Sequence, residues 1–270
     1  MRDFILETLA EDVGRGDLYA KVLPSTKQDG YLVAKSDAVL AGVVYVNELA
    51  LLEAFEIKWQ KQEGEAYQKG DILATFSGNS HTLLKIERTM LNILHHASGI
   101  ATLTRKYVDL INPYGVMLLD TRKTRPKLRI FEKYASVVGG ATNHRMGLDD
   151  ALMLKDTHLK TIKDLNSYIS KARKKIPFTT TIEVECEDYE MAKSAMQADA
   201  DIIMCDNMTP GEITEVVRLR NESHPKVRIE ASGNISLETV ELYAQTGVDA
   251  ISTGSTIHQA VWPDISMKIN

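Results

Sequence analysis

The sequence predicts an α/β protein in which a small N-terminal α+β region is followed by an incomplete parallel α/β barrel. In the second part of the chain, near-continuous apolar runs alternate with helical patterns, which is typical of a parallel sheet covered on both faces. The composition is that of a globular protein, with 44% hydrophobic and 26% charged residues. A chain of 270 residues is long enough for a barrel plus a smaller domain.

The first part of the chain has the pattern of a small α+β domain that ends near Gly78. Residues 3–12 have the pattern of a short amphipathic helix. Further elements are expected as β runs at 30–35, 38–43, 56–61 and 71–76, and as a helix at 46–54. The longest helical pattern covers 82–112, where Ser98-Gly99 either divides it into two helices or kinks one helix.

The second part alternates strands with helices. Strands are predicted at 116–119, 152–154, 180–184, 201–205, 227–231 and 249–252. Helices are predicted between them, at 159–175, 188–197, 210–221 and 236–245. Six strands fit an incomplete barrel, or a barrel completed by a segment that the pattern does not reveal.

Each of the six strands ends in polar residues that suit charged ligands. In chain order these are Asp120-Thr121-Arg122, Lys155, Glu185, Asp206, Ser232-Gly233 and Gly254-Ser255. In α/β barrels the active site lies at the carboxyl ends of the strands. We therefore expect one pocket with a cationic side, an acidic side and a phosphate-binding corner. A single polar strand end is common, so the prediction depends on the coincidence over all six.

The cationic side is expected to come from Arg122, Lys123, Arg145 and Lys155. Guanidinium groups bind carboxylates bidentately, and lysine adds point charge. Ion pairs with neighbouring acids are the alternative role for these cations. His144 and His158 either orient a substrate or act as structural hydrogen-bonding groups. Four nearby cations are expected on the solvated face of a helix or in a dimer contact, namely Arg125, Lys127, Arg129 and Lys133.

The acidic side is expected from Glu185 and Asp206, which end neighbouring strands. They could share one Mg²⁺, directly or through water, because magnesium usually takes one or two protein carboxylates together with substrate phosphates. Glu183 competes for this role, since alternation places it on the same face as Glu185, but Glu185 lies nearer the strand end. The turns at Ser232-Gly233 and Gly254-Ser255 are expected to present backbone N–H groups to a phosphate.

Several function classes are disfavoured by composition. A net charge of −5 argues against nucleic-acid binding and favours a small anionic substrate for the local basic cluster. Cys186 and Cys205 have neither a disulfide framework nor metal-ligand spacing. Acids near the N-terminus argue against a signal peptide, and no apolar run approaches membrane-spanning length. We therefore expect a cytoplasmic protein without a membrane partner.

A set of motifs resembles the quinolinate phosphoribosyltransferase family, also called nicotinate-nucleotide pyrophosphorylase (carboxylating). The motifs are Glu11–Asp17 (EDVGRGD), Glu87–Asn92 (ERTMLN), Ser98–Thr102 (SGIAT), Asp120–Thr124 (DTRKT), Asn143–Leu148 (NHRMGL), Leu154–His158 (LKDTH), Glu183–Glu185 (EVE), Asp206-Asn207 and Ala231–Gly233 (ASG). They follow the family order across nearly the whole chain, and their combination is specific. Thr157 stands where the family often has Asn, and Ala231 where it often has Ser; neither change removes a charge.

The resemblance implies an N-terminal α/β sandwich domain with its connecting helix over residues 1–112 and an open α/β barrel over 113–270. It leaves open that the N-terminal helix and the C-terminal tail pack across these domains. It also implies a homodimer, and possible higher oligomers, in which Arg88 reaches the partner's site. The implied reaction joins quinolinate to phosphoribosyl pyrophosphate with decarboxylation, giving nicotinate mononucleotide, CO₂ and pyrophosphate in NAD biosynthesis.

The resemblance also implies roles for individual residues. The quinolinate carboxylates would be held by Arg122, His144, Arg145 and Lys155. The candidate catalytic residues are Lys123 and Lys155, near the reacting groups, and Glu185 and Asp206, which would face the ribose and the Mg²⁺-pyrophosphate. The 5′-phosphate would be bound by Ser232, Gly233 and Gly254, with His258 nearby.

Three other functions are weighed against this reaction. A Schiff-base aldolase would use Lys155 as its nucleophile, but Arg122, Arg145 and His158 crowd that lysine with carboxylate binders. A homologue from molybdenum-transport loci would share the fold, and the intact set of cations argues against it. A degenerate ligand-binding paralogue would have lost charged site residues, and none is lost.

Overall fold

The computed structural model describes all 270 residues, which divide into two compact units. Unit 1 consists of Met1–Leu103 and Gln259–Asn270, and unit 2 consists of Thr104–His258. The division falls inside helix α3 (Ser80–Ile111), whose first three-quarters belong to unit 1. No helix combines the length and the apolar character needed to cross a membrane.

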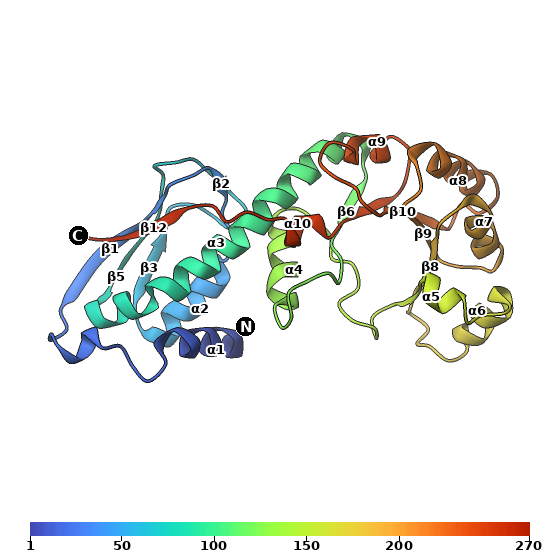
Figure 1. Ribbon diagram of the computed structural model, residues 1–270. Helices are drawn as coiled ribbons and strands as arrows, with labels where there is room; N and C mark the ends of the chain where they lie inside the picture. Colours follow the sequence, from blue (N-terminus) through green and yellow to red (C-terminus); the bar gives the residue numbers. More distant parts are fainter. The chain divides into compact units, whose positions relative to one another are not determined.

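Unit 1 is built on a four-stranded antiparallel sheet with the order β12-β1-β5-β3 (Figure 1). Its strands are β1 (Lys27–Ala34), β3 (Glu56–Trp59), β5 (Ile72–Asn79) and β12 (Ile265–Ile269). A small separate ribbon pairs β2 (Ala38–Val39) with β4 (Ala66–Tyr67). The unit's helices, besides α3, are α1 (Arg2–Val13), α2 (Val43–Glu53) and the 3₁₀ turn Tyr19–Lys21. The buried positions alternate toward the end of β1, as in a sheet with one face on the core.

Helix α3 continues through Ser98-Gly99 without the break or division that the sequence left open. A Cβ atom at Gly99 would lie 2.7 Å from the carbonyl oxygen of Val261, in the segment that leads to β12. Glycine at this position therefore permits close packing of that segment against the helix. It does not end the helix.

We expect Gly99→Ala to destabilise the protein by up to about 2 kcal/mol. Overpacking costs roughly 1–3 kcal/mol, and the better helix propensity of alanine returns only about 1 kcal/mol. Gly211, in the first turn of α8 (Pro210–Ser223), has open space at the corresponding position. Gly211→Ala should therefore stabilise by up to about 1 kcal/mol. Urea denaturation measures both variants, and the same sign for both would show that packing is not the reason for Gly99.

Unit 2 contains a six-stranded parallel sheet with the order β6-β11-β10-β9-β8-β7, which confirms the predicted open barrel. Its strands are β6 (Met117–Leu119), β7 (Leu152–Leu154), β8 (Ile182–Cys186), β9 (Ile202–Asp206), β10 (Arg228–Ser232) and β11 (Ala250–Ser252). The sheet ends at β6 and β7, which do not pair with each other.

The helices of unit 2 follow the strands, and Figure 1 shows α7 and α8 outside the sheet beside β8 and β9. They are α4 (Arg129–Val138), α5 (Asp156–Leu159), α6 (Leu165–Arg173), α7 (Tyr189–Gln197), α8, α9 (Val240–Ala244) and α10 (Ser255–His258), with a 3₁₀ turn at Asn112–Tyr114. Side-chain caps fix two starts: Asp188 accepts the N–H of Met191, and Thr209 and Glu212 form a capping box. Of the helix predicted at 159–175, only α6 forms, apart from Leu159 at the end of α5, and the helix predicted from 236 begins at Val240.

Candidate active site

The carboxyl ends of the parallel strands surround a cleft of about 420 Å³. Eight residues predicted from the sequence line it: Arg122, Lys123, His144, Arg145, Lys155, Glu185, Asp206 and Ser232. Sequence reasoning missed Met153, Met204 and Ser252, which line the same cleft. All three are inward-facing strand residues, so the alternation along each strand was the signal that could have identified them.

The predicted phosphate-binding glycines do not line this cleft, but they fit close backbone approaches. Gly233 has φ 93, and a Cβ atom there would lie 2.4 Å from the amide oxygen of Asn207. A Cβ atom at Gly254 would lie 3.2 Å from Cδ of Lys123 and 3.3 Å from Cδ2 of His258. Gly254 therefore lies next to Lys123, which lines the cleft, and His258 lies next to Gly254. Arg88 belongs to unit 1, where its side chain is exposed on α3.

The cationic side of the cleft carries two guanidinium groups without a carboxylate partner. Nη1 of Arg145 donates to the carbonyl oxygen of Ala151 at 3.1 Å, and Nη2 contacts Sδ of Met153 at 3.4 Å. Burial and the neighbouring charge of Arg122 lower the pKa of Arg145. The buried Nε of Arg122 has no hydrogen-bond partner. The two cations repel each other, and an anionic ligand would relieve that repulsion.

The acidic side consists of Glu185 on β8 and Asp206 on β9. Nζ of Lys155 forms an ion pair with Glu185, whose residue is only 7% exposed. Burial and the charge of Glu185 raise the pKa of Asp206, and the charges of Lys155 and Lys123 partly oppose that rise. Both carboxylates thus line the cleft, and Lys155 pairs with one of them, Glu185.

Lys133 corrects a prediction about the helix that follows the first strand. The sequence placed it on a solvated face, but its side chain is fully buried and forms an ion pair with Asp120. Asp120 also accepts the backbone N–H of His144 at 2.9 Å, and burial raises its pKa. Arg125 lies before α4 and pairs with the buried Glu132 at 2.6 Å. These buried pairs anchor the loops that carry Arg122, His144 and Arg145.

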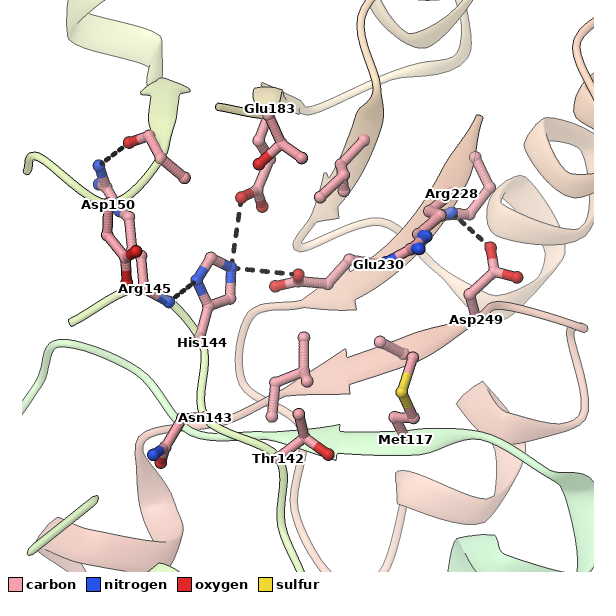
Figure 2. Close-up of a pocket in the computed structure, with 16 residues that line it drawn as sticks. Met117, Thr142, Asn143, His144, Arg145, Asp150, Glu183, Arg228, Glu230 and Asp249 are labelled. Carbon is pink, nitrogen blue, oxygen red and sulfur yellow. Dashed lines mark hydrogen bonds and ion pairs between the residues drawn. The ribbon is translucent and has the colours of Figure 1, made fainter. Parts of the chain in front are cut away.

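His144 is held from inside the barrel by two buried carboxylates (Figure 2). Its Nε2 lies 3.3 Å from Oε2 of Glu183 and 3.3 Å from Oε2 of Glu230. Burial alone would lower the pKa of His144, but the two carboxylates outweigh it and raise the pKa, which favours a proton on Nε2. Nδ1 accepts the backbone N–H of Arg145 at 2.7 Å, so Nε2 is the ring nitrogen that bears a proton. Burial and the charge of Glu230 raise the pKa of Glu183, and His144 opposes that rise.

Glu230 was not singled out from the sequence. It lies two residues before Ser232 on β10, on the inward face, as Glu183 lies two residues before Glu185 on β8. Glu183, Glu230 and His144 line a second cavity of about 280 Å³ toward the amino ends of the strands. His158 has the structural role that was weighed as its alternative, since its Nδ1 accepts the N–H of Lys155 at 3.0 Å.

An open parallel barrel with unpaired guanidinium groups opposite two carboxylates defines an anion-binding α/β barrel of the enzyme type. Two family models match the chain: the quinolinate phosphoribosyl transferase C-terminal domain over residues 100–268 and the N-terminal domain over residues 17–98. The chain therefore belongs to the quinolinate phosphoribosyltransferase family, which confirms the resemblance seen in its motifs.

Individual relatives agree along nearly the whole chain. A probable nicotinate-nucleotide pyrophosphorylase (carboxylating) from Synechocystis is 40% identical, covering 98% of this chain and 91% of the relative. One of the same description from Bacillus subtilis is 37% identical, covering 96% and 90%. The solved nicotinate-nucleotide pyrophosphorylase from Francisella tularensis has a TM-score of 0.92 at 32% identity, covering 100% of this chain and 95% of that one.

Proposed function

We propose that this protein transfers the phosphoribosyl group of phosphoribosyl pyrophosphate to quinolinate. The products are nicotinate mononucleotide, CO₂ and pyrophosphate, in NAD biosynthesis. The observation that carries the proposal is the pair of guanidinium groups, Arg122 and Arg145, without carboxylate partners in a cleft opposite Glu185 and Asp206. A dicarboxylate such as quinolinate supplies the two anionic groups that these cations lack.

The acidic side suits the other half of the reaction. Departure of pyrophosphate from C1 of the ribose builds positive charge at that carbon, which the carboxylates of Glu185 and Asp206 can stabilise. After the ring nitrogen attacks C1, loss of CO₂ leaves an electron pair at C2 of the pyridine ring. Arg145 and Lys155, as members of the cationic side, would stabilise that negative charge. No residue is assigned here as general acid or base.

Mg²⁺ is proposed as the cofactor, and the donor set fits it. Glu185 and Asp206 are neighbouring carboxylates, and burial together with the charge of Glu185 raises the pKa of Asp206. Magnesium is usually held by one or two carboxylates plus substrate phosphates, so these two residues would hold it, directly or through water. When bound, Mg²⁺ neutralises charge on the leaving pyrophosphate. Lys123 would remain near the same phosphates.

For the 5′-phosphate we propose Ser232, Gly233 and Gly254, with His258 nearby. Ser232 lines the cleft, and its Oγ lies 3.1 Å from Oγ of Ser252. Gly254 adjoins both Lys123 and His258, which supports their place at the same end of the barrel. A cytoplasmic location is proposed as well, since the two buried cysteines are free thiols.

The proposed reaction is tested by incubating the purified protein with quinolinate, phosphoribosyl pyrophosphate and Mg²⁺. Nicotinate mononucleotide should appear on chromatography together with an equal amount of CO₂. Nicotinate in place of quinolinate should give little product, and chelation of Mg²⁺ should stop turnover until Mg²⁺ is restored. A folded protein that forms no product from quinolinate would sink the proposal.

We further propose a homodimer in which Arg88 acts in the partner's site. Its support is the exposed position of this arginine on α3, together with its motif. Arg88→Ala and Lys155→Met should each be nearly inactive alone. Mixed and reassociated, they should recover up to about a quarter of wild-type activity, because half of the dimers then contain one intact site. No recovery, with mass spectrometry showing that the subunits have exchanged, would place Arg88 in its own subunit's chemistry.

A further inference from the structure

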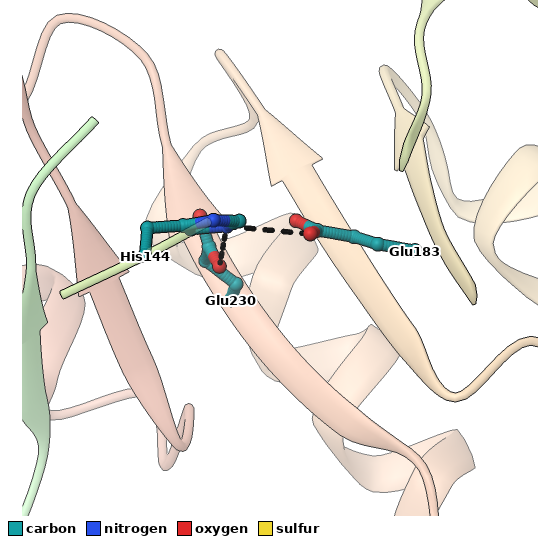
Figure 3. A group of neighbouring side chains, drawn as sticks. All are labelled: His144, Glu183 and Glu230. Carbon is teal, nitrogen blue, oxygen red and sulfur yellow. Dashed lines mark ion pairs between the residues drawn. The ribbon is translucent and has the colours of Figure 1, made fainter. Parts of the chain in front are cut away.

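The glutamates Glu183 and Glu230 both point toward the ring of His144 (Figure 3), and they line the second cavity and not the cleft. We propose that they are positioning residues, which clamp the His144 ring and thereby hold the backbone of Arg145 where its guanidinium can bind a substrate carboxylate. The inference rests on the proposed function, and it assigns His144 to support of the cationic side. Direct contact between the ring nitrogens and quinolinate is then not required.

The ring nitrogens of His144 are both engaged by the protein. Nε2 faces the two glutamates, each at 3.3 Å, and Nδ1 accepts the Arg145 N–H at 2.7 Å. An imidazole has no other hydrogen-bonding atom to offer a ligand. His144 can therefore affect an anion in the cleft mainly through the neighbour that it holds.

The contacts form a continuous chain from the glutamates to the substrate cleft. The glutamates fix the orientation of the ring, and the ring fixes the amide of Arg145. The backbone N–H of His144 is anchored separately on Asp120 at 2.9 Å. With its amide fixed, the side chain of Arg145 can reach the carbonyl oxygen of Ala151, just before β7, and Met153, within β7. Without the contacts to the glutamates the ring of His144 could reorient, while the backbone N–H of His144 would stay anchored on Asp120.

Stability does not explain two carboxylates at these positions. Glu183 is 0% exposed and Glu230 is 2% exposed. Neither oxygen of Glu183 has a hydrogen-bond partner, and Oε1 of Glu230 also lacks one. Burying carboxylates with so few partners costs free energy, and apolar side chains would pack there at lower cost. Buried carboxylates with so few partners depart from the usual rule that buried polar groups are hydrogen-bonded. Such departures are expected at functional sites.

A divalent-cation site is the competing explanation. The ligand atoms of His144, Glu183 and Glu230 lie within 4.8 Å of one another, and two of these side chains are buried. However, Nδ1 accepts an N–H, so the proton of the neutral ring is on Nε2 and no lone pair there points at the glutamates. The geometry therefore favours an ion-paired clamp, in which Nε2 of His144 faces the two carboxylates.

Glu183→Gln and Glu230→Gln test the clamp, because each keeps the shape of the side chain and removes its charge. We expect the KM for quinolinate to rise about 10-fold or more, as is usual when a supporting partner of a binding group is lost. The KM for phosphoribosyl pyrophosphate should change less than about twofold, since Glu185 and Asp206 are untouched. Val216→Thr, which keeps the shape of the side chain but places a hydroxyl at a buried position of α8, controls for lost stability and should leave both KM values unchanged.

A double-mutant cycle separates positioning from a direct role. If the glutamates act through the ring, Glu183→Gln should have almost no further effect on the quinolinate KM in a His144→Asn background. A full additional factor there would overturn the inference. So would equal rises in both KM values, or Mn²⁺ or Zn²⁺ binding to the full-length protein that Glu183→Gln abolishes. An inactive wild-type protein would instead refute the proposed reaction, so the two failures are distinguishable.

Discussion

Replacing Lys155 with methionine should lower kcat/KM for quinolinate by about a thousandfold. This factor corresponds to about 4 kcal/mol, the size expected when a charged contact with the substrate is lost and a buried carboxylate is left unpaired. Two effects add. The cleft loses one of its cations, and Glu185, only 7% exposed, loses the ammonium with which it pairs. Steady-state kinetics with quinolinate varied at saturating phosphoribosyl pyrophosphate measures the change.

Lys160→Met is the matched control for that variant. Lys160 follows α5, and its side chain is 76% exposed and pairs with Asp156 at 3.3 Å on the surface. Exposed pairs contribute at most about 1 kcal/mol, and this one lies outside the cleft residues, so kcat/KM should change less than about twofold. Equal losses in the two variants would mean that general positive charge, and not the position of Lys155, matters.

Lys133→Met should destabilise unit 2 by about 3–5 kcal/mol, the usual cost of removing one partner of a buried ion pair. Asp120 would be left as a buried carboxylate with its pKa already raised by burial. Urea denaturation at neutral pH measures the loss. Lys127→Met, at an exposed position six residues earlier, should stay within about 0.5 kcal/mol of wild type.

The double variant Lys133→Met/Asp120→Leu separates stability from activity. Replacing both members of a buried ion pair with apolar groups is often neutral or better, so most of the stability should return. Turnover of quinolinate should not return, because the N–H of His144 loses its carboxylate acceptor and the loop that carries Arg145 loses an anchor. Recovery of both properties would show that Asp120 acts only as the counter-ion of Lys133.

The barrel and the rim of its cleft could be predicted because their signals are local. Each parallel strand is a short, largely apolar segment of three to five residues, and the polar residue at its carboxyl end lies within that segment or next to it in the sequence. The rule that strand ends meet then assembles residues such as Arg122, Glu185 and Asp206 without knowledge of any contact. Five of the eight predicted cleft residues were found in this way, whereas Lys123, His144 and Arg145 came from the basic motifs.

What the sequence could not provide depends on contacts between distant segments. Lys133 has the pattern of a surface lysine until the carboxylate of Asp120, thirteen residues earlier, lies beside it. Glu230 appears as an ordinary strand residue until His144 approaches from another loop. Gly99 resembles a helix breaker, because its close neighbour Val261 is far along the chain. Strand β12 was missed because its five residues can be recognised as a strand only from their pairing with β1.

The pairing of β12 with β1 sets the order in which the two units can be completed during synthesis. All of unit 2 is synthesised between the two segments that unit 1 needs, so the unit begun first on the ribosome is finished last. Until Ile265–Ile269 emerges, β1 is an edge strand with unpaired N–H and C=O groups. During translation, such an unpaired edge can form hydrogen bonds with a strand of another chain. The nascent chain is thus most exposed to aggregation just before its synthesis reaches β12.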